Sequence, residues 1–548
     1  MGADESTSLL PVEDEHSQSS GIVRTFEPMS LEYKHANQAE GVFRYLEIAT
    51  TAKPQEAPDT LLPLAEPLES PTVEAHQKRL GVVPLAVIIF YSVSGGPFGC
   101  EASVRAGGNF YTLLGFLVMP WVWSVQEALI TAELGTAFPE ASGGVAWVEE
   151  AFGPSAGWMS GYLSWVAGAT DNAIYPVLFS DYVLAMQSDS EEVNPVSRFL
   201  LLSGTSLALG YINWLGLPLV GAMSVWICIV AMSPFLIMTV VGAFQIEPSR
   251  WLELPQRDPT SNDTGTDTGD DDDTSGGLFP NASLGGVLLR PFFNNLFWNL
   301  NSFDSASSFA ADIDNPGRVL PRAMMWSVLL VVSCYLFPLM IAIGATDTNQ
   351  RDWVDGYLAS ITSEIAGPWL GAWTVFAAGI SNVGQFQAEL SSDAFQLMGM
   401  ADRGYLPKLF SIRSKHGTPT YGILLGTVVV VFLGVSDLAT LIELLNFNYS
   451  ISLLMEYCAF IKLRISRPDL ERPFRIPLDT TGCILMLVPT FLLTLLVLGL
   501  ATYQTYLFSV IVIIVGSFIF RGRQQSQATR TDTDHESALL REDTTSTD

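Results

Sequence analysis

The chain of 548 residues is 49% hydrophobic and only 15% charged, with a mean hydropathy of +0.31 and a formal net charge of -29. So apolar a composition argues against a soluble protein, and many windows exceed the roughly 18 apolar residues that span a bilayer. The five cysteines show no CxxC spacing or histidine pairing, and no P-loop occurs. We therefore expect no disulfide framework, no metal, no cofactor and no use of ATP.

The acidic charge lies mostly outside the apolar segments, in the first 80 residues, at 247–273 and after Arg523. Residues 1–80 are rich in Ser, Pro and Glu, which favours disorder, and they carry no signal peptide. Their first residues, MGADES, fit the N-myristoylation pattern. We expect acidic and polar disordered cytoplasmic tails at 1–80 and 522–548, and a transmembrane domain at 81–521 with an acidic outer loop at 247–283.

Twelve apolar segments follow the first tail, near 84–106, 111–137, 156–187, 198–214, 217–243, 287–312, 321–345, 368–400, 419–435, 437–463, 482–502 and 504–520. The first is interrupted by the sequence SGGPFG at 94–99, directly before Glu101. Glycine and proline make a continuous helix costly there. In a bilayer the freed backbone groups need protein or a water-filled cavity as partner, so a broken helix indicates a transporter binding site.

The sixth segment is also interrupted, because asparagines, serines and an aspartate fill its middle: NNLFWNLNSFDSASS at 294–308. Segments one and six occupy corresponding positions in two halves of five segments each, as expected of an inverted repeat. We therefore predict an all-α integral membrane protein with about twelve transmembrane helices. They form a 5+5 inverted repeat with discontinuous helices 1 and 6, followed by two C-terminal helices.

The connecting loops predict the orientation. Basic residues gather in the even-numbered connections and after the last segment: Arg318, Arg322, Arg403, Lys408, Arg413, Lys415, Lys462, Arg464, Arg467, Arg472, Arg475, Arg521 and Arg523. The positive-inside rule then places both termini in the cytoplasm. Glu140, Glu149 and Glu150 in an inner loop go against this pattern. Two sequons, at Asn262 and Asn281, fall in the outer loop. The outer acids are either solubilising or concentrate cations at the outer mouth.

The acids inside the spans are the main functional clue: Glu101, Glu127, Glu133, Asp171, Asp181, Asp304, Asp312, Glu389, Asp393 and Glu456. A carboxylate at membrane depth should face a cavity, pair with a base or carry a proton. Bases in the spans are scarce, with Arg105 the main candidate partner. Glu133 could be structural, whereas Asp181, Asp312 and Asp393 near helix ends favour interfacial or ion-pair roles. Trp298 and Tyr175, close in sequence to acids, suit ammonium binding through cation–π attraction.

Several motifs between about residues 80 and 500 resemble those of plant polyamine uptake transporters, the L-type-transporter branch of the amino acid–polyamine–organocation superfamily. They include SGGPFGCEASV at 94–104, EALITAEL at 127–134, DNAIYPVLFSDY at 171–182, LFWNLN at 296–301, DSAS at 304–307, DWVDGY at 352–357 and ELSSDAFQLMGMA at 389–401. The resemblance implies proton-coupled uptake of putrescine- or spermidine-like cations. The family usually has a second acid after the position of Glu101, where this chain has Ala102.

We expect alternating access around a central substrate site formed by Ser94, Gly95, Gly96, Glu101, Asp171, Tyr175, Trp298, Asn301, Phe303, Asp304 and Glu389. Two separated acids would hold the two ammonium groups of putrescine, with aromatic side chains on the methylenes between. Glu101, Asp171 and Glu389 are the candidates for binding the coupling proton, because burial can raise the pKa of a carboxyl group towards neutral pH.

Other readings of the sequence stay open. A proton-coupled amino-acid transporter of the same fold is the main alternative, since the Gly95–Gly96 break could cradle a substrate carboxylate. A membrane sensor is remote, because no signalling domain is recognisable, and an enzyme is weaker still. The expected partners are the polyamine, protons and the lipid bilayer, with no nucleic acid and no indicated partner subunit. The plasma membrane is the first choice of location, and an endomembrane or the vacuole the second.

Overall fold

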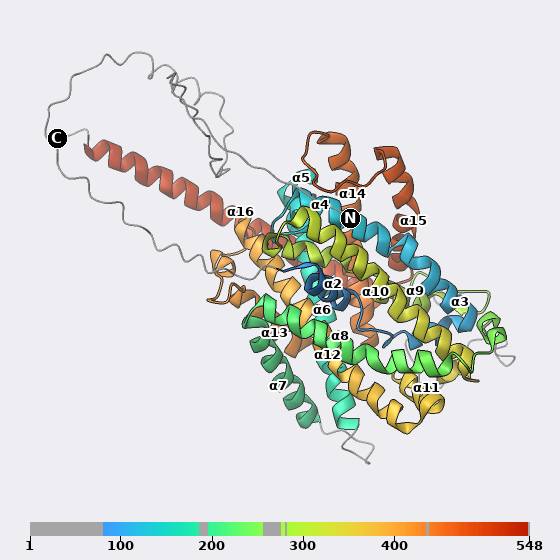
Figure 1. Cartoon of the computed structure of the whole chain (residues 1–548). Helices are drawn as coiled ribbons and strands as arrows, with labels where there is room; N and C mark the ends of the chain where they lie inside the picture. Colours follow the sequence, from blue (N-terminus) through green and yellow to red (C-terminus); the bar gives the residue numbers. More distant parts are fainter. Residues whose placement is uncertain (1–79, 186–194, 256–275, 280–281, 435–437, 546–548) are drawn as a thin grey trace, which may run out of the picture. The chain divides into compact units, whose positions relative to one another are not determined.

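The computed structural model of the protein describes residues 80–185, 195–255, 276–279, 282–434 and 438–545, with the side chains of 180–185, 195, 438–439 and 526–545 outside the description. The first tail, with its myristoylation pattern, and both sequons therefore lie outside the described residues. The described part is helical apart from short connections (Figure 1) and one antiparallel hairpin, in which β1 (Ser283–Leu284) pairs with β2 (Val287–Leu288).

The helices follow one another in chain order as α2 (Val82–Val93), α3 (Glu101–Val122), α4 (Ser124–Ala137), α5 (Gly144–Phe152), α6 (Pro154–Ala185), α7 (Pro195–Trp214), α8 (Leu217–Gly242), η1 (Pro248–Leu252), α9 (Leu289–Leu300), η2 (Phe303–Asp312), α10 (Pro316–Ala345), η3 (Gln350–Asp352), α11 (Tyr357–Ala366), α12 (Pro368–Asp402), η4 (Lys408–Ser411), α13 (Thr420–Leu433), α14 (Leu438–Ser466), α15 (Thr480–Gly499) and α16 (Tyr503–Thr545). The helix α16 thus continues past the boundary at residue 521 that we expected for the membrane domain.

Within the described residues, five stretches are long and apolar enough to cross a membrane: Glu101–Ala137, Leu217–Gly242, Pro316–Ala345, Thr480–Gly499 and Tyr503–Gln525. Two shorter helices, α2 and α13, are also strongly apolar. The described part is therefore mostly helical with several helices that could span a membrane, as predicted, whereas the twelve spans and the inverted repeat stay predictions. The long helices α6, α12 and α14 miss this apolar criterion because each carries buried polar side chains.

The first predicted break is present. Helix α2 ends at Val93, where Ser94 N–H still donates to Phe90 O, and the chain is non-helical until α3 begins at Glu101. Gly96 and Gly99 both have positive φ, at 99° and 83°, in a region that favours glycine. A second interruption at Gly108, with φ 68°, divides α3 near the predicted boundary between the first two segments.

The second predicted break lies between α9 and η2. Asn301 is extended, and Ser302 adopts a left-handed conformation with φ 77°, one of two described non-glycine residues with positive φ. The chain then continues as η2 to Asp312 and passes beside the start of α2, where Leu80 and Ile313 form a parallel bridge. The two breaks have different chemical causes. Proline and glycine interrupt the helix at the first break, and polar side chains interrupt it at the second.

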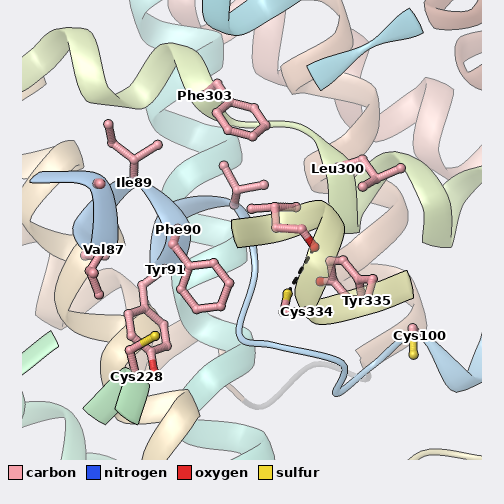
Figure 2. Close-up of a cluster of buried hydrophobic side chains, with 14 of the residues drawn as sticks. Val87, Ile89, Phe90, Tyr91, Cys100, Cys228, Leu300, Phe303, Cys334 and Tyr335 are labelled. Carbon is pink, nitrogen blue, oxygen red and sulfur yellow. Dashed lines mark hydrogen bonds between the residues drawn. The ribbon is translucent and has the colours of Figure 1, made fainter. Parts of the chain in front are cut away.

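The central helices pack extensively on each other: α6 contacts α12 and α14, α8 contacts α12, and α2 contacts α10 and α8. Around the first break, Phe90 and Tyr91 of α2 lie in a fully buried cluster with Tyr335 of α10, shown in Figure 2. The same view shows the non-helical chain leaving α2 and reaching Cys100. Burial of large aromatic side chains there fixes the ends of the interrupted helix.

The inner-loop acids that went against the charge pattern are paired with bases. Arg403, after α12, contacts Glu140 at 2.6 Å and Glu149 at 2.5 Å, and Arg467 contacts Glu150 at 3.5 Å. These loops, predicted to lie on one side of the membrane, thus meet one another in the fold. The cytoplasmic orientation itself stays a prediction.

Candidate functional site

An acidic cavity lies among α6, α12, α14 and η2. Its carboxylates come from all four elements: Asp171, Asp304, Glu389, Asp393 and Glu456. Serines of η2 and the loop before α5 also line it, and none of the described residues that line it is Lys, Arg or His. The open space is about 40 Å³, enough for a few water molecules. Carboxylates gathered without an internal base favour a cation, protons or both as ligands.

Asp171 is held by two aromatic donors. Tyr175 Oη, one turn further along α6, donates to Asp171 Oδ2 at 2.8 Å. Trp298 Nε1 of α9 donates to Asp171 Oδ1 at 2.9 Å. In this structure the polar atoms of both rings orient the carboxylate, and packing of the rings against substrate methylenes stays a prediction.

Two glycines make room for the other carboxylates. A Cβ atom at Gly168 of α6 would lie 2.2 Å from Asp393 Oδ1 and 2.9 Å from Glu389 Oε1. A Cβ atom at Gly144 would lie 2.0 Å from Glu456 Oε1. Because real Cβ atoms essentially never come so close, any larger residue at these two positions would displace the acids. Glu389 Oε2 and Asp393 Oδ2 are buried and have no hydrogen-bond partner among the described residues.

Asp304 and Glu127 meet at Tyr449. Tyr449 Oη lies 2.5 Å from Asp304 Oδ1 and 2.8 Å from Glu127 Oε1, and it accepts a hydrogen bond from Ser302 N at 3.1 Å. The backbone N–H of Asp304 donates to the same Glu127 oxygen at 3.0 Å. The start of η2 is therefore attached to α4 and α14 by one polar cluster.

The first break forms a separate polar region. Ser94 Oγ accepts from Gly96 N at 3.1 Å, and Ser381 Oγ of α12 donates to Gly95 O. Gly99 N–H donates to Glu101 Oε2 at 2.8 Å. The other oxygen of Glu101 is buried and has no hydrogen-bond partner among the described residues.

The sequence-predicted site residues thus fall into two groups. Asp171, Asp304 and Glu389 line the acidic cavity, whereas the other eight do not. Trp298 connects the two groups. Its indole N–H donates to Asp171, and its ring lies so near Gly99 that a Cβ atom added there would be 3.0 Å from the ring. Phe303 is fully buried in the apolar core, and Asn301 Nδ2 donates to Phe297 O at 2.8 Å. Substrate binding by all eleven residues stays a prediction.

Sequence reasoning left four polar residues of this region out of the site. Asp393 and Glu456 line the cavity, although Asp393 was expected near a helix end. The spacing of Glu389 and Asp393, one helical turn apart, could have placed both on one face. Glu127 and Tyr449 come from distant parts of the chain, and local sequence carries no signal for their contact with Asp304.

Glu133 belongs to a different kind of site. Arg464 donates to both its oxygens, Ile476 N–H donates at 2.8 Å, and Arg472 Nε lies 3.1 Å away. Two bases, Arg464 in the last turn of α14 and Arg472 just after that helix, therefore neutralise this acid, in place of the Arg105 that we expected to be the main partner. Asp312 likewise pairs with Arg413, at 2.8 Å.

Comparison with known proteins matches residues 80–518 to the amino acid permease family. A probable polyamine transporter of Arabidopsis thaliana is 42% identical over 444 residues, covering 81% of this chain and 86% of that protein. A polyamine transporter of Oryza sativa subsp. japonica is 39% identical over 439 residues, 80% of this chain and 77% of that protein. A b(0,+)-type amino acid transporter of Mus musculus is 24% identical over 458 residues, 81% and 87% of the two chains. The chain is therefore an integral membrane protein of the amino acid permease family and, within that family, a relative of the plant polyamine transporters.

Proposed function

We propose that the protein is a proton-coupled secondary transporter of polyamines that works by alternating access. The observation that carries this proposal is the cavity with five carboxylates and no base among its described lining residues. Putrescine and spermidine are polycations at neutral pH, so several carboxylates offer the counter-charge that they lose on leaving water. Relatives named polyamine transporters, at 39–42% identity, support the same substrate class.

In this proposal the substrate chain lies between the two groups of site residues. One ammonium is held at the first break by Ser94, Gly95, Gly96 and Glu101, and the other by cavity acids such as Glu389. Asn301 and Phe303 border the path between them. The present open volume of about 40 Å³ is too small for a polyamine. Substrate entry therefore requires the cavity to widen, which the two breaks permit because they interrupt the helices beside it.

The wider architecture belongs to the same proposal. Twelve helices would cross the membrane as a 5+5 inverted repeat with two additional helices and with both termini in the cytoplasm. Ion pairs among the basic loops support placing those loops together on one side. The plasma membrane is the proposed location, and symport with protons the proposed coupling.

Amino-acid transport is the second candidate function. The observation in its favour is the non-helical stretch at 94–100, since bare backbone N–H groups at a helix break can bind a substrate carboxylate. The permease match and the b(0,+)-type relative agree with it. The five cavity acids favour the polyamine, because an amino acid brings a carboxylate that offsets its ammonium charge, whereas the charges of a polyamine are all positive.

The test is uptake of radiolabelled putrescine and leucine into liposomes that contain the purified protein, with and without an inward proton gradient. We expect gradient-stimulated putrescine uptake that leucine does not compete away. Asp304→Asn and Glu389→Gln should each lower that uptake about tenfold or more, as loss of a charge-assisted contact predicts. Glu364→Gln, an exposed acid of α11, is the control and should transport as the wild type does. Leucine uptake without putrescine flux would rule out the polyamine proposal.

A further inference from the structure

The cluster of Glu127, Tyr449 and Asp304 contains more hydrogen-bond acceptors than its visible donors can satisfy. Tyr449 Oη contacts carboxylate oxygens of both Glu127 and Asp304, at 2.8 and 2.5 Å. A phenol has one proton to donate, and Ser302 N–H already uses one of the lone pairs of this hydroxyl. Only one of the two carboxyls can therefore receive the phenol proton. The other must itself hold a proton, or two oxygen lone pairs would face each other.

Among the described residues, no basic side chain supplies a positive charge to this pair. Outside the cluster itself, the titratable groups that interact with it are Glu456 and Tyr457 of α14 and Glu389 of α12. None of these is a base. Helices α3, α10 and α15 also pack against α4; α15 carries no charged residue, and the charged residues of α3 and α10 lie in the first two turns of each helix, at Glu101, Arg105, Arg318 and Arg322.

Glu127 also has an unused oxygen. The residue is 1% exposed, and its Oε2 has no hydrogen-bond partner among the described residues. A buried, unpaired carboxylate is costly in a membrane protein unless it is protonated. This observation is independent of the contacts at Oε1, and it indicates a proton on the same side chain or its exchange with Asp304.

We propose that Glu127 and Asp304, bridged by Tyr449, bind one proton, and that this is the proton coupled to transport. The proposal rests on the proposed function for the coupling, and it replaces Glu101, Asp171 and Glu389 as the coupling site. Glu127 acts here as a proton-binding residue and Tyr449 as a positioning residue, and both Asp304 and Tyr449 also face the cavity.

The position explains how the proton would act on the fold. Glu127 Oε1 accepts the backbone N–H of Asp304, and Tyr449 accepts that of Ser302, so both contacts hold the start of η2 directly after the second break. Loss of the proton leaves two carboxylates on one hydroxyl, and their repulsion separates η2 from α4 and α14. A substrate cation beside Asp304 can replace the lost positive charge, which links proton release to cation binding.

The experiment compares wild type, Glu127→Gln and Tyr449→Phe in proteoliposomes, with putrescine as the substrate. Glu443→Gln is the matched control, because Glu443 is another acid of α14, and it accepts from Thr502 N and Thr505 Oγ1 away from the cavity. Wild type and the control should accumulate putrescine on an inward proton gradient. Glu127→Gln should lose that accumulation and exchange putrescine at a rate that no longer changes with pH. Tyr449→Phe should shift the pH midpoint by about one unit or more, since a charge-assisted hydrogen bond is removed.

A second measurement does not depend on the substrate. Infrared difference spectra of the purified protein between acidic and alkaline pH should show the carbonyl stretch of a buried protonated carboxyl. This band should vanish in Glu127→Gln and remain in Glu443→Gln. If wild type carries leucine and no putrescine, the proposed function fails, and the proton site is then judged by the infrared band and by gradient-driven leucine uptake. Wild-type pH dependence or an unchanged band in Glu127→Gln would overturn the proton site.

Discussion

Glu127 and Glu133 lie on the same helix, α4, and are both buried, yet their surroundings are opposite. Glu133 receives hydrogen bonds from Arg464 and Ile476 N–H, and Arg472 lies 3.1 Å away. Glu127 instead shares a phenol with Asp304, another acid. Burial by itself therefore does not tell what a membrane carboxylate does.

The difference lies in whether the protein supplies the counter-charge. Where two arginines are built in, the acid is paired within the chain and serves as a structural connection between α4 and the end of α14. Where no base is built in, the positive charge must come from outside the chain, as a proton or a substrate cation. Single substitutions in the arginine-paired site and in the acidic cavity test this difference.

The largest expected effect comes from Arg464→Ala. Its guanidinium is 1% exposed against a fully buried Glu133, and removing one partner of a buried pair leaves an uncompensated charge. Such losses cost about 3–5 kcal/mol, so the melting temperature and the yield of detergent-solubilised protein should both fall sharply. Arg472 remains near Glu133 and limits the loss. A melting temperature equal to that of the wild type would show that Glu133 is neutral in the folded protein.

A smaller effect, on transport rather than stability, is expected from Gly168→Ala. The new Cβ would collide with Asp393 and Glu389, so the acids must move and putrescine uptake should fall by about tenfold or more. Gly204→Ala in α7 is the matched control, because no atom lies within 4 Å of its added Cβ. The control should keep wild-type uptake and gain at most about 1 kcal/mol of stability from the helix. Equal uptake by both variants would show that the cavity acids are not needed.

The sequence predicted those features of the fold that depend on neighbouring residues. The break at 94–100 follows from Gly95, Gly96 and Pro97, and the break at Asn301 and Ser302 follows from a run of polar residues inside an apolar segment. The boundary between the first two segments falls at Gly108, as the local pattern indicated. Such breaks can be predicted from the sequence because one or two residues are enough to interrupt a helix.

The partners of the acids could not be predicted, because they depend on long-range packing. Glu133 meets Arg464 across 331 positions, and Glu127 meets Tyr449 across 322. Sequence inspection assigned Arg464 to an inner loop and therefore offered Glu133 no base. It also gave Trp298 and Tyr175 a packing role, since the direction of an indole or phenol donor is set only by the fold.

The smallest expected effect comes from Arg467→Gln, which removes an exposed ion pair and so contrasts with the buried pair of Arg464 and Glu133. Arg467 lies 3.5 Å from Glu150, and the two side chains are 46% and 39% exposed. Water already solvates both charges, so their pairing contributes about 0–1 kcal/mol, and added salt should remove what there is. The melting temperature of this variant should differ little from that of the wild type at low salt and not at all at high salt. A loss as large as that of Arg464→Ala would mean that ion pairs in this protein stabilise it regardless of burial. The contrast between Glu127 and Glu133 would then no longer separate functional acids from structural ones.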